Sequence, residues 1–332
     1  MNERKRTLDI LRGIGIFLMV FDHVGWGSFV HGYIQSFHMP LFFIASGYLW
    51  KNENTVNLIR KRFKTLMVPY FIFSGFYLLL QQITLFSTGN DFMSSLRAVL
   101  IYPTDIDCMP IAPALWFLPC MFFSSIVYSY LSKLKRQYKR NVVVGIAVIG
   151  MVYSSMSNIM LPFALEPLSV AIAFMLFGEI IRECENDVSK WIDRYWVIFI
   201  LFITGALLAI LNGSVDMRSA RYHNCALYII NSIMGYLTYW GISKKIDANM
   251  IRIPRICVQK LTFFSRYAMG YICMNQLSIM LLDKLLKTFV ADGLIFKIVS
   301  KVGVFTITMI SIEYITKQIM NSKFKFILGR RS

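Results

Sequence analysis

Two ionisable residues share the first apolar stretch of the chain. Arg12 and His23 are eleven positions apart within the segment LDILRGIGIFLMVFDHVGWG. At 100° per residue this spacing brings both side chains to one face of a helix, separated by about 16 Å along its axis. Ionisable groups are costly in an apolar span and generally face a cavity or a partner. A cation followed along the same stripe by an imidazole, which titrates near neutral pH, suits an anionic cofactor and proton transfer.

Other polar residues surround this pair in the sequence. Asp9 and Asp22 flank it, and His38 opens the next apolar segment, SFHMPLFFIASGYLW, in which a proline starts or breaks a helix. Adjacent helical residues point about 100° apart, so we do not expect Asp22 to touch His23. A structural interpretation is that Arg12 extends to the inner membrane surface and His23 hydrogen-bonds a neighbouring helix.

The composition predicts an all-α, polytopic membrane protein. The 332 residues are 56% hydrophobic and 16% charged, with a mean hydropathy of +0.55, whereas soluble domains are roughly 45–50% apolar and about 25% charged. Strict period-2 alternation is absent, which favours helices over a membrane barrel. About ten transmembrane helices are expected, each covering about 20 apolar residues. The predicted spans are 8–30, 34–50, 65–86, 113–131, 141–160, 167–182, 195–212, 225–242, 262–282 and 294–316.

The basic residues predict the orientation. The net charge of +17 comes from short blocks between apolar runs, which is typical of cytoplasmic loops and not of a nucleic-acid-binding face. The predicted inner segments carry 26 Lys and Arg residues and the outer ones five, so both termini are expected in the cytoplasm. The basic N-terminus is similar to a signal peptide, but no cleavage site follows, and we expect a retained first span. Residues 1–332 form one predicted membrane domain, and no cysteine or histidine spacing indicates a metal site.

Two segments carry a resemblance to a known family. Residues 7–23 and 37–48 resemble the bacterial acyltransferase-3 family of membrane acyltransferases, in particular its fucose 4-O-acetylase-like branch, in which an Asp-Ile-Leu-(Lys/Arg)-Gly start leads to a histidine and then to FHMPLFF and Ser-Gly-Tyr-Leu. Weaker matches continue along nearly the whole chain, including RKRFKTLMVPYF at 60–71 and ALWFLP at 114–119. The matching residues are Asp9, Arg12, Gly13, His23, His38, Met39, Pro40, Leu41, Phe42, Phe43, Ser46, Gly47 and Tyr48.

The resemblance implies transfer of an acyl group, usually acetyl from acetyl-CoA, to a hydroxyl of a lipid-linked or cell-surface glycan at a bacterial inner membrane. His23 is the expected base or transient acyl carrier, and Arg12 is expected to act with it. Coenzyme A phosphates are expected to meet Arg12 together with a cytoplasmic basic cluster. That cluster includes Arg60, Arg62 and Lys64.

Candidate acceptor-binding residues have structural alternatives. His38 and Asn275 are expected near the acceptor, although His38 is equally suited to ending a helix. Trp116 is either an interfacial aromatic residue or a stacking surface for a sugar. Glu166 either binds substrate or caps the start of a helix. Asp216 is a similar candidate. Glu179 and Arg266 are a predicted intramembrane ion pair.

One position departs from the family pattern. In the segment SRYAMGYICMNQ, Asn275 stands where the family commonly has a histidine. An amide donates and accepts hydrogen bonds but does not gain or lose a proton at neutral pH, so no acid–base chemistry is expected at this position. The alternatives to an enzyme are a transporter or flippase for a glycan or small anion, and a non-catalytic scaffold. Neither repeats nor matching broken halves, which transporters often show, are evident in the sequence.

Overall fold

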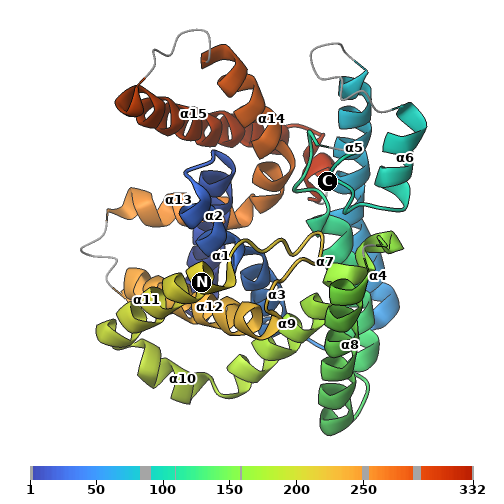
Figure 1. Cartoon of the computed structure of the whole chain (residues 1–332), viewed down its shortest axis with the longest axis vertical. Coiled ribbons are helices and arrows are strands. Elements are labelled where there is room, and N and C mark those ends of the chain that lie inside the picture. Colours follow the sequence, from blue (N-terminus) through green and yellow to red (C-terminus); the bar gives the residue numbers. More distant parts are fainter. Residues whose placement is uncertain are drawn as a thin grey trace.

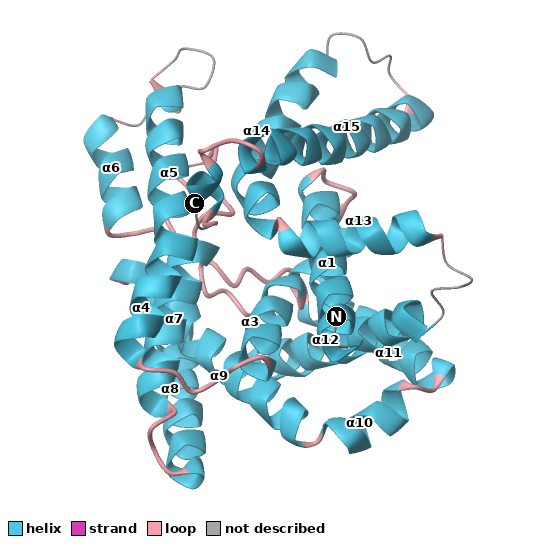
Figure 2. Cartoon of the chain, turned by 180° about the vertical axis from the view of Figure 1, so that it is seen from behind, coloured by secondary structure: helices cyan, strands magenta, loops and turns pink. Residues whose placement is uncertain are grey.

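The protein is helical throughout the described parts of the chain. The computed structural model describes residues 3–82, 91–108, 110–157, 159–248, 254–286 and 293–330. Within these ranges the one β-type pairing is an isolated bridge between Asp216 and Arg221 (Figure 2). The predicted all-α class is therefore confirmed.

Membrane-length apolar helices occur in several parts of the chain. Four helical stretches are long and apolar enough to cross a bilayer: Thr55–Gln81, Pro162–Glu183, Tyr195–Asn212 and Leu294–Met320. In the last two, α11 and α15, only 22% of the most apolar 18-residue stretch is buried inside the protein. Most of the surface of these two helices is therefore available to contact lipid. These helices support a multi-pass membrane protein, while the count of ten spans and the placement of the termini stay predictions.

The remaining helices complete the bundle (Figure 1). The stretch Thr55–Gln81 contains α4 (Thr55–Arg62), a π-helical turn η1 (Phe63–Met67) and α5 (Val68–Gln81). The segment between the predicted spans 65–86 and 113–131 contains α6 (Phe92–Leu100), and residues 87–90 of that segment lie outside the described ranges. The others are α7 (Phe117–Leu131), α8 (Arg136–Met156), α9 (Leu165–Glu183), α10 (Glu185–Ile192), α12 (Cys225–Ala248), α13 (Arg255–Arg266) and α14 (Ala268–Leu286).

The region of the first two predicted spans, 8–30 and 34–50, forms three helices and not two. Helix α1 (Glu3–His23) ends seven residues before position 30, because Gly25 and Gly27 adopt φ values of 84° and 108°, which continue no right-handed helix. The chain then forms α2 (Ser28–Gln35) and α3 (His38–Tyr48). All eleven residues of α3 are buried, and at 1.5 Å per residue it is about 16 Å long, too short to cross a bilayer alone.

Helix α1 lies at the centre of the bundle and packs against α3, α12, α13 and α14 (Figure 1). Asp9 of α1 accepts a hydrogen bond from the Ser265 hydroxyl of α13 at 3.3 Å. Leu8, Leu11, Ile16 and Val20 are almost completely buried. Because neighbouring helices surround α1, the rotation that sets the direction of Arg12 and His23 is fixed.

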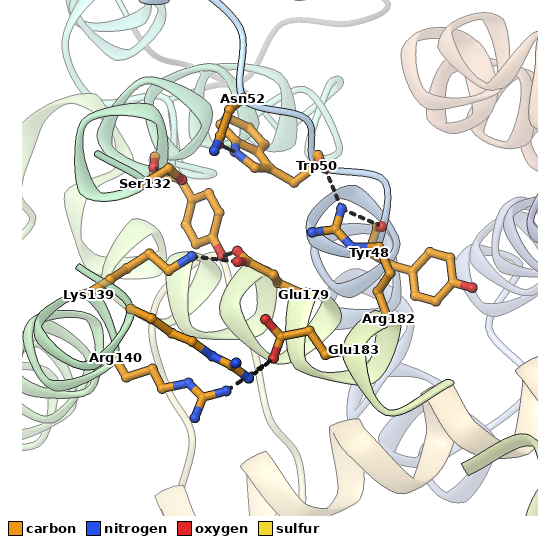
Figure 3. Close-up of polar contacts among 11 residues, drawn as sticks. Tyr48, Trp50, Asn52, Ser132, Lys139, Arg140, Glu179, Arg182 and Glu183 are labelled. Atoms are coloured by element: carbon orange, nitrogen blue, oxygen red, sulfur yellow. Dashed lines mark hydrogen bonds and ion pairs between the residues drawn. The ribbon is translucent and has the colours of Figure 1, made fainter. Parts of the chain in front are cut away.

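A polar network joins the helices on the other side of α3 (Figure 3). The Lys139 ammonium of α8 lies 2.6 Å from the Glu179 carboxylate of α9, which also accepts a hydrogen bond from Tyr128. The predicted Glu179–Arg266 pair is therefore wrong, because α9 packs against α7 and α8. A charge buried in a membrane helix needs a partner on an adjacent helix, and here Lys139 is that partner.

Helix α3 is held closely against α9. Gly47 and Gly178 lie at the crossing, where a Cβ atom on Gly47 would approach the Met175 carbonyl oxygen to 1.8 Å, and one on Gly178 the Ile44 oxygen to 2.0 Å. Small residues allow such backbone contact between membrane helices. Arg182 then donates to the carbonyls of Tyr48, the last residue of α3, at 3.3 Å, and of Trp50, two residues beyond it (Figure 3).

We expect Gly178→Ala to destabilise the protein, because its methyl group would collide with the α3 backbone. Overpacking of this kind costs about 1–3 kcal/mol of unfolding free energy. Gly145→Ala is the matched control, since nothing lies within 4 Å of a Cβ atom at that helical glycine. Thermal unfolding in detergent should show a lower midpoint for Gly178→Ala alone; equal midpoints for the two variants would contradict this packing.

Candidate active site

The His23 imidazole is fixed by a hydrogen bond to Asn275. The His23 Nδ1 and Asn275 Oδ1 atoms are 2.6 Å apart. The Asn275 Nδ2 group donates to the carbonyls of Tyr271, at 2.7 Å, and Ile272, at 3.1 Å, in its own helix. Both amide hydrogens are thereby used, and the amide oxygen must face the ring. His23 Nδ1 is therefore the donor, and in the neutral imidazole the lone pair lies on Nε2.

The His38 ring is also held through its Nδ1 atom, but by a backbone carbonyl. Its Nδ1 donates to the Ile34 carbonyl at 3.0 Å, across the break between α2 and α3. A carbonyl only accepts, so the neutral His38 ring also has its lone pair on Nε2. His38 lies at a helix end, as its structural alternative predicts, since it is the first residue of α3.

Both rings line one cavity of about 250 Å³. It lies between the end of α1, α2, the start of α3, the loop before α7, the 213–224 loop and α14. Trp116, Phe42 and Phe117 supply aromatic surface. The polar lining residues are His23, His31, Gln35, His38, Asp216, Arg218 and Gln276.

Asp22 lies behind this cavity and binds other residues than His23, as the helical geometry predicted. Its side chain is 1% exposed and accepts hydrogen bonds from His31 Nδ1, at 3.0 Å, and from Gln35 Nε2, at 2.7 Å. The hydrogen bond with the Asp22 carboxylate raises the pKa of His31 above its ordinary value, although partial burial opposes this shift. His31 is thus protonated to a higher pH than a free histidine.

A short turn brings Arg218 to the opposite wall. Asp216 and Arg221 pair through two backbone hydrogen bonds of 2.8 and 2.9 Å. The Asp216 carboxylate accepts from the Arg218 backbone N–H and guanidinium, both at 2.9 Å, and from the Ser219 hydroxyl at 2.8 Å. Burial works against ionisation of Asp216, but Arg218 and Ser219 lower its pKa below the ordinary value. The ion pair therefore persists over the neutral range.

Arg12 lies at the other end of the α1 stripe and does not line the His23 cavity. Its charge interacts with that of Asp9 in its own helix, with Tyr236 of α12 and with Arg62 of α4, and Arg62 also interacts with Glu53. Within the described residues Arg12 forms no hydrogen bond, and the buried Arg62 Nε also lacks a partner there. Together the two guanidinium groups offer donors suited to an anion, while Asp9 and Glu53 offset part of their charge.

A second cavity, of about 350 Å³, opens near the N-terminal end of α1. Its lining includes Thr7, Tyr48, Trp240 and Asp247. Thr7 donates to the Asp247 carboxylate at 2.6 Å. The hydroxyl of Tyr236, which interacts electrostatically with both Tyr48 and Arg12, is buried and has no hydrogen-bond partner in the described structure. Among the described residues a cavity therefore lies toward each end of α1, and Arg12 is nearer the second.

The remaining predicted site residues divide into two groups. Trp116 lines the His23 cavity, and Asn275 supports His23 from behind. Glu166 lies outside the cavity and accepts a hydrogen bond from the Leu161 backbone, which fits its structural alternative as a helix-start residue. Arg60 and Lys64 are exposed, and only Arg62 of the predicted basic cluster approaches Arg12.

Sequence reasoning missed four polar cavity residues. His31, Gln35, Arg218 and Gln276 were not candidates, although His31 lies between the two histidines that were. Three histidines within sixteen positions around a glycine-rich turn were an available signal. No sequence signal pointed to Arg218, because it reaches the cavity only through the position of the 213–224 loop, which is far from α1 in the sequence.

Comparisons with known proteins give a family match. A family model described as an acyltransferase domain, of the acyltransferase-3 type, matches residues 5–316. No curated protein and no solved structure matches the chain.

We expect Asn275→Leu to remove the tautomer preference of His23. In the unaltered protein the ¹⁵N shifts of labelled imidazoles should show Nδ1 protonated and Nε2 unprotonated in neutral His23. His38 is the internal control, because its acceptor is the Ile34 carbonyl and not Asn275. An unchanged His23 signal in Asn275→Leu, with the His38 signal also unchanged, would show that the amide does not set the tautomer.

Proposed function

Because the chain belongs to the acyltransferase-3 family, we propose that it moves an acyl group, most simply acetyl, from acyl-CoA to a hydroxyl of a cell-surface or lipid-linked glycan. The observation that carries this proposal is the His23 ring, which Asn275 holds from behind while the ring lines a cavity. A fixed imidazole with a free Nε2 lone pair is suited to general-base catalysis near neutral pH.

The proposed reaction has two bond changes. His23 Nε2 takes the proton of the acceptor hydroxyl as its oxygen attacks the thioester carbonyl. The tetrahedral intermediate then expels the coenzyme A thiolate, which receives the proton from the imidazolium. One ester forms, one thioester breaks, and His23 returns to its neutral state. Asn275 cannot take part in the proton transfer, but its oxygen stabilises the imidazolium through Nδ1–H.

We assign the donor to the Arg12 end of the stripe. Arg12 and Arg62 offer guanidinium donors that the described residues leave unused, and phosphate groups are the partners that such forks bind best. Arg60 and Lys64 are exposed nearby on the same segment and would contribute long-range attraction. The second cavity provides the proposed entry on the cytoplasmic side, where the basic residues concentrate.

We assign the acceptor to the His23 cavity. Trp116, Phe42 and Phe117 offer aromatic surface to the apolar face of a sugar, while His38 presents an unprotonated Nε2. In this arrangement the protein is a multi-pass enzyme of a bacterial inner membrane with both termini in the cytoplasm. Glu166 has no place in the acceptor site.

We expect His23→Gln to reduce acylation by a factor of about 10²–10⁴, because glutamine cannot take the acceptor proton. The measurement is the O-acetyl content of surface glycans by mass spectrometry in cells that express the variant, with its membrane level determined by immunoblotting. His223→Gln is the matched control, since this exposed histidine lies outside the cavity. Normal acetylation with His23→Gln at an equal membrane level would falsify the catalytic assignment.

We expect Arg12→Gln and Arg62→Gln to weaken donor binding. Loss of a charge-assisted hydrogen bond costs about 1.5–3 kcal/mol, which corresponds to a KM for acetyl-CoA raised about 10- to 150-fold. Arg60→Gln removes the same charge from an exposed side chain and should change KM less than about threefold. If all three variants raised KM equally, a diffuse cytoplasmic charge and not the Arg12–Arg62 site would bind the donor.

A further inference from the structure

The His23 cavity has two basic side chains, Arg218 and His31, each hydrogen-bonded to its own carboxylate. Arg218 is paired with Asp216, and His31 is paired with Asp22. They come from α2 and from the 213–224 loop, so they approach the cavity from separate elements. Neither pair is needed for proton transfer by His23.

The cations retain unused donors. A guanidinium has five N–H groups, and Asp216 accepts from Nη2 of Arg218, whose side chain is only 17% exposed. The Arg218 Nε is buried without a hydrogen-bond partner among the described residues. In His31, Nδ1 faces Asp22, so Nε2 of the half-exposed ring is left for a ligand, and it carries a hydrogen whenever the ring is protonated.

The two carboxylates are already occupied. Asp22 is buried and receives hydrogen bonds from His31 and Gln35. Asp216 receives three hydrogen bonds within its own turn, two of them from Arg218. His23 and His38, the other titratable lining groups, each use Nδ1 as a donor to the protein. A ligand in this cavity therefore meets unused cationic donors and two imidazole lone pairs.

We propose that the acceptor carries an anionic group, a carboxylate or a phosphate, which Arg218 and His31 bind while His23 faces the hydroxyl that is acylated. This inference rests on the proposed function. A buried guanidinium nitrogen without a partner is costly, and an oxyanion satisfies it by a charge-assisted, often bidentate hydrogen bond. The cavity of about 250 Å³ is smaller than typical sites for drug-sized ligands, so we assign it a single sugar residue.

The test is equilibrium binding of small probes to the full-length protein in nanodiscs, measured by saturation-transfer NMR. The probes are methyl β-D-glucuronide for a carboxylate, α-D-glucose 1-phosphate for a phosphate, and methyl β-D-glucoside as the neutral control. At least one anionic probe should bind about tenfold more tightly than the glucoside, which corresponds to one charge-assisted hydrogen bond. The stronger of the two anionic probes identifies the chemical group.

Arg218→Gln should remove this preference. Arg221→Gln is the matched control, because Arg221 belongs to the same turn, carries the same charge, is exposed and does not line the cavity. The inference is overturned if anionic and neutral probes bind equally to the unaltered protein, if neither anionic probe binds at millimolar concentration, or if Arg218→Gln retains the preference.

Binding of acetyl-CoA to the same samples separates this inference from the proposed function. Unaltered protein that prefers an anionic probe but binds no acetyl-CoA would contradict the donor assignment and leave the anion site standing. If Arg218→Gln alone loses acetyl-CoA binding, its fold is disturbed, and Arg218→Lys replaces it. Lysine keeps the charge without the planar fork, so the preference should fall; a full preference in that variant would overturn the role of the guanidinium.

Discussion

The hydrogen bond between His23 and Asn275 is the interaction on which the proposed chemistry depends. It joins α1 to α14 across 252 positions of sequence and fixes three properties of the ring: its orientation, its tautomer and the nitrogen left for a substrate. The Asn275 amide fixes the ring because its nitrogen donates to two backbone carbonyls of its own helix, so its oxygen must point toward His23. A histidine at the same place could exchange protons with His23, whereas an amide keeps the proton on Nδ1. The departure from the family pattern is therefore compatible with a base at His23 and assigns Asn275 to positioning.

That interaction needs α1 and its neighbours in fixed positions. In a bilayer, apolar burial between helices gives little driving force, and close packing with a few polar contacts takes its place. The α3–α9 crossing brings backbone against backbone at Gly47 and Gly178, and Arg182 secures the C-terminal end of α3. Because α3 begins with His38, these contacts, six to twelve residues farther along the chain, determine where the second imidazole lies. The Lys139–Glu179 pair, in turn, fixes α8 on α9.

Local sequence rules predicted the features that depend on one helix. The common stripe of Arg12 and His23 and the separation of Asp22 from His23 follow from helical periodicity, and the proline near His38 indicated a helix boundary there. The end of α1 at His23 was missed because an apolar window does not register two glycines with positive φ. The partner of Glu179 and the position of Arg218 were beyond such rules, since both depend on which helices and loops meet. Asn275 was recognised only as a departure from a pattern, and its contact with His23 is a long-range property.

The separation of Arg12 from His23 has a consequence for the proposed donor. An anion held near Arg12 and Arg62 lies about 16 Å along the helix from the imidazole, so the phosphates cannot be where the acyl group reacts. Coenzyme A is compatible with this distance because a long flexible arm separates its phosphates from its thioester. The same separation keeps the cationic charge of Arg12 away from His23, whose task requires a neutral ring before each reaction. A donor whose anion adjoined its acyl group, such as an acyl phosphate, would need the two groups side by side, and this helix does not provide that arrangement.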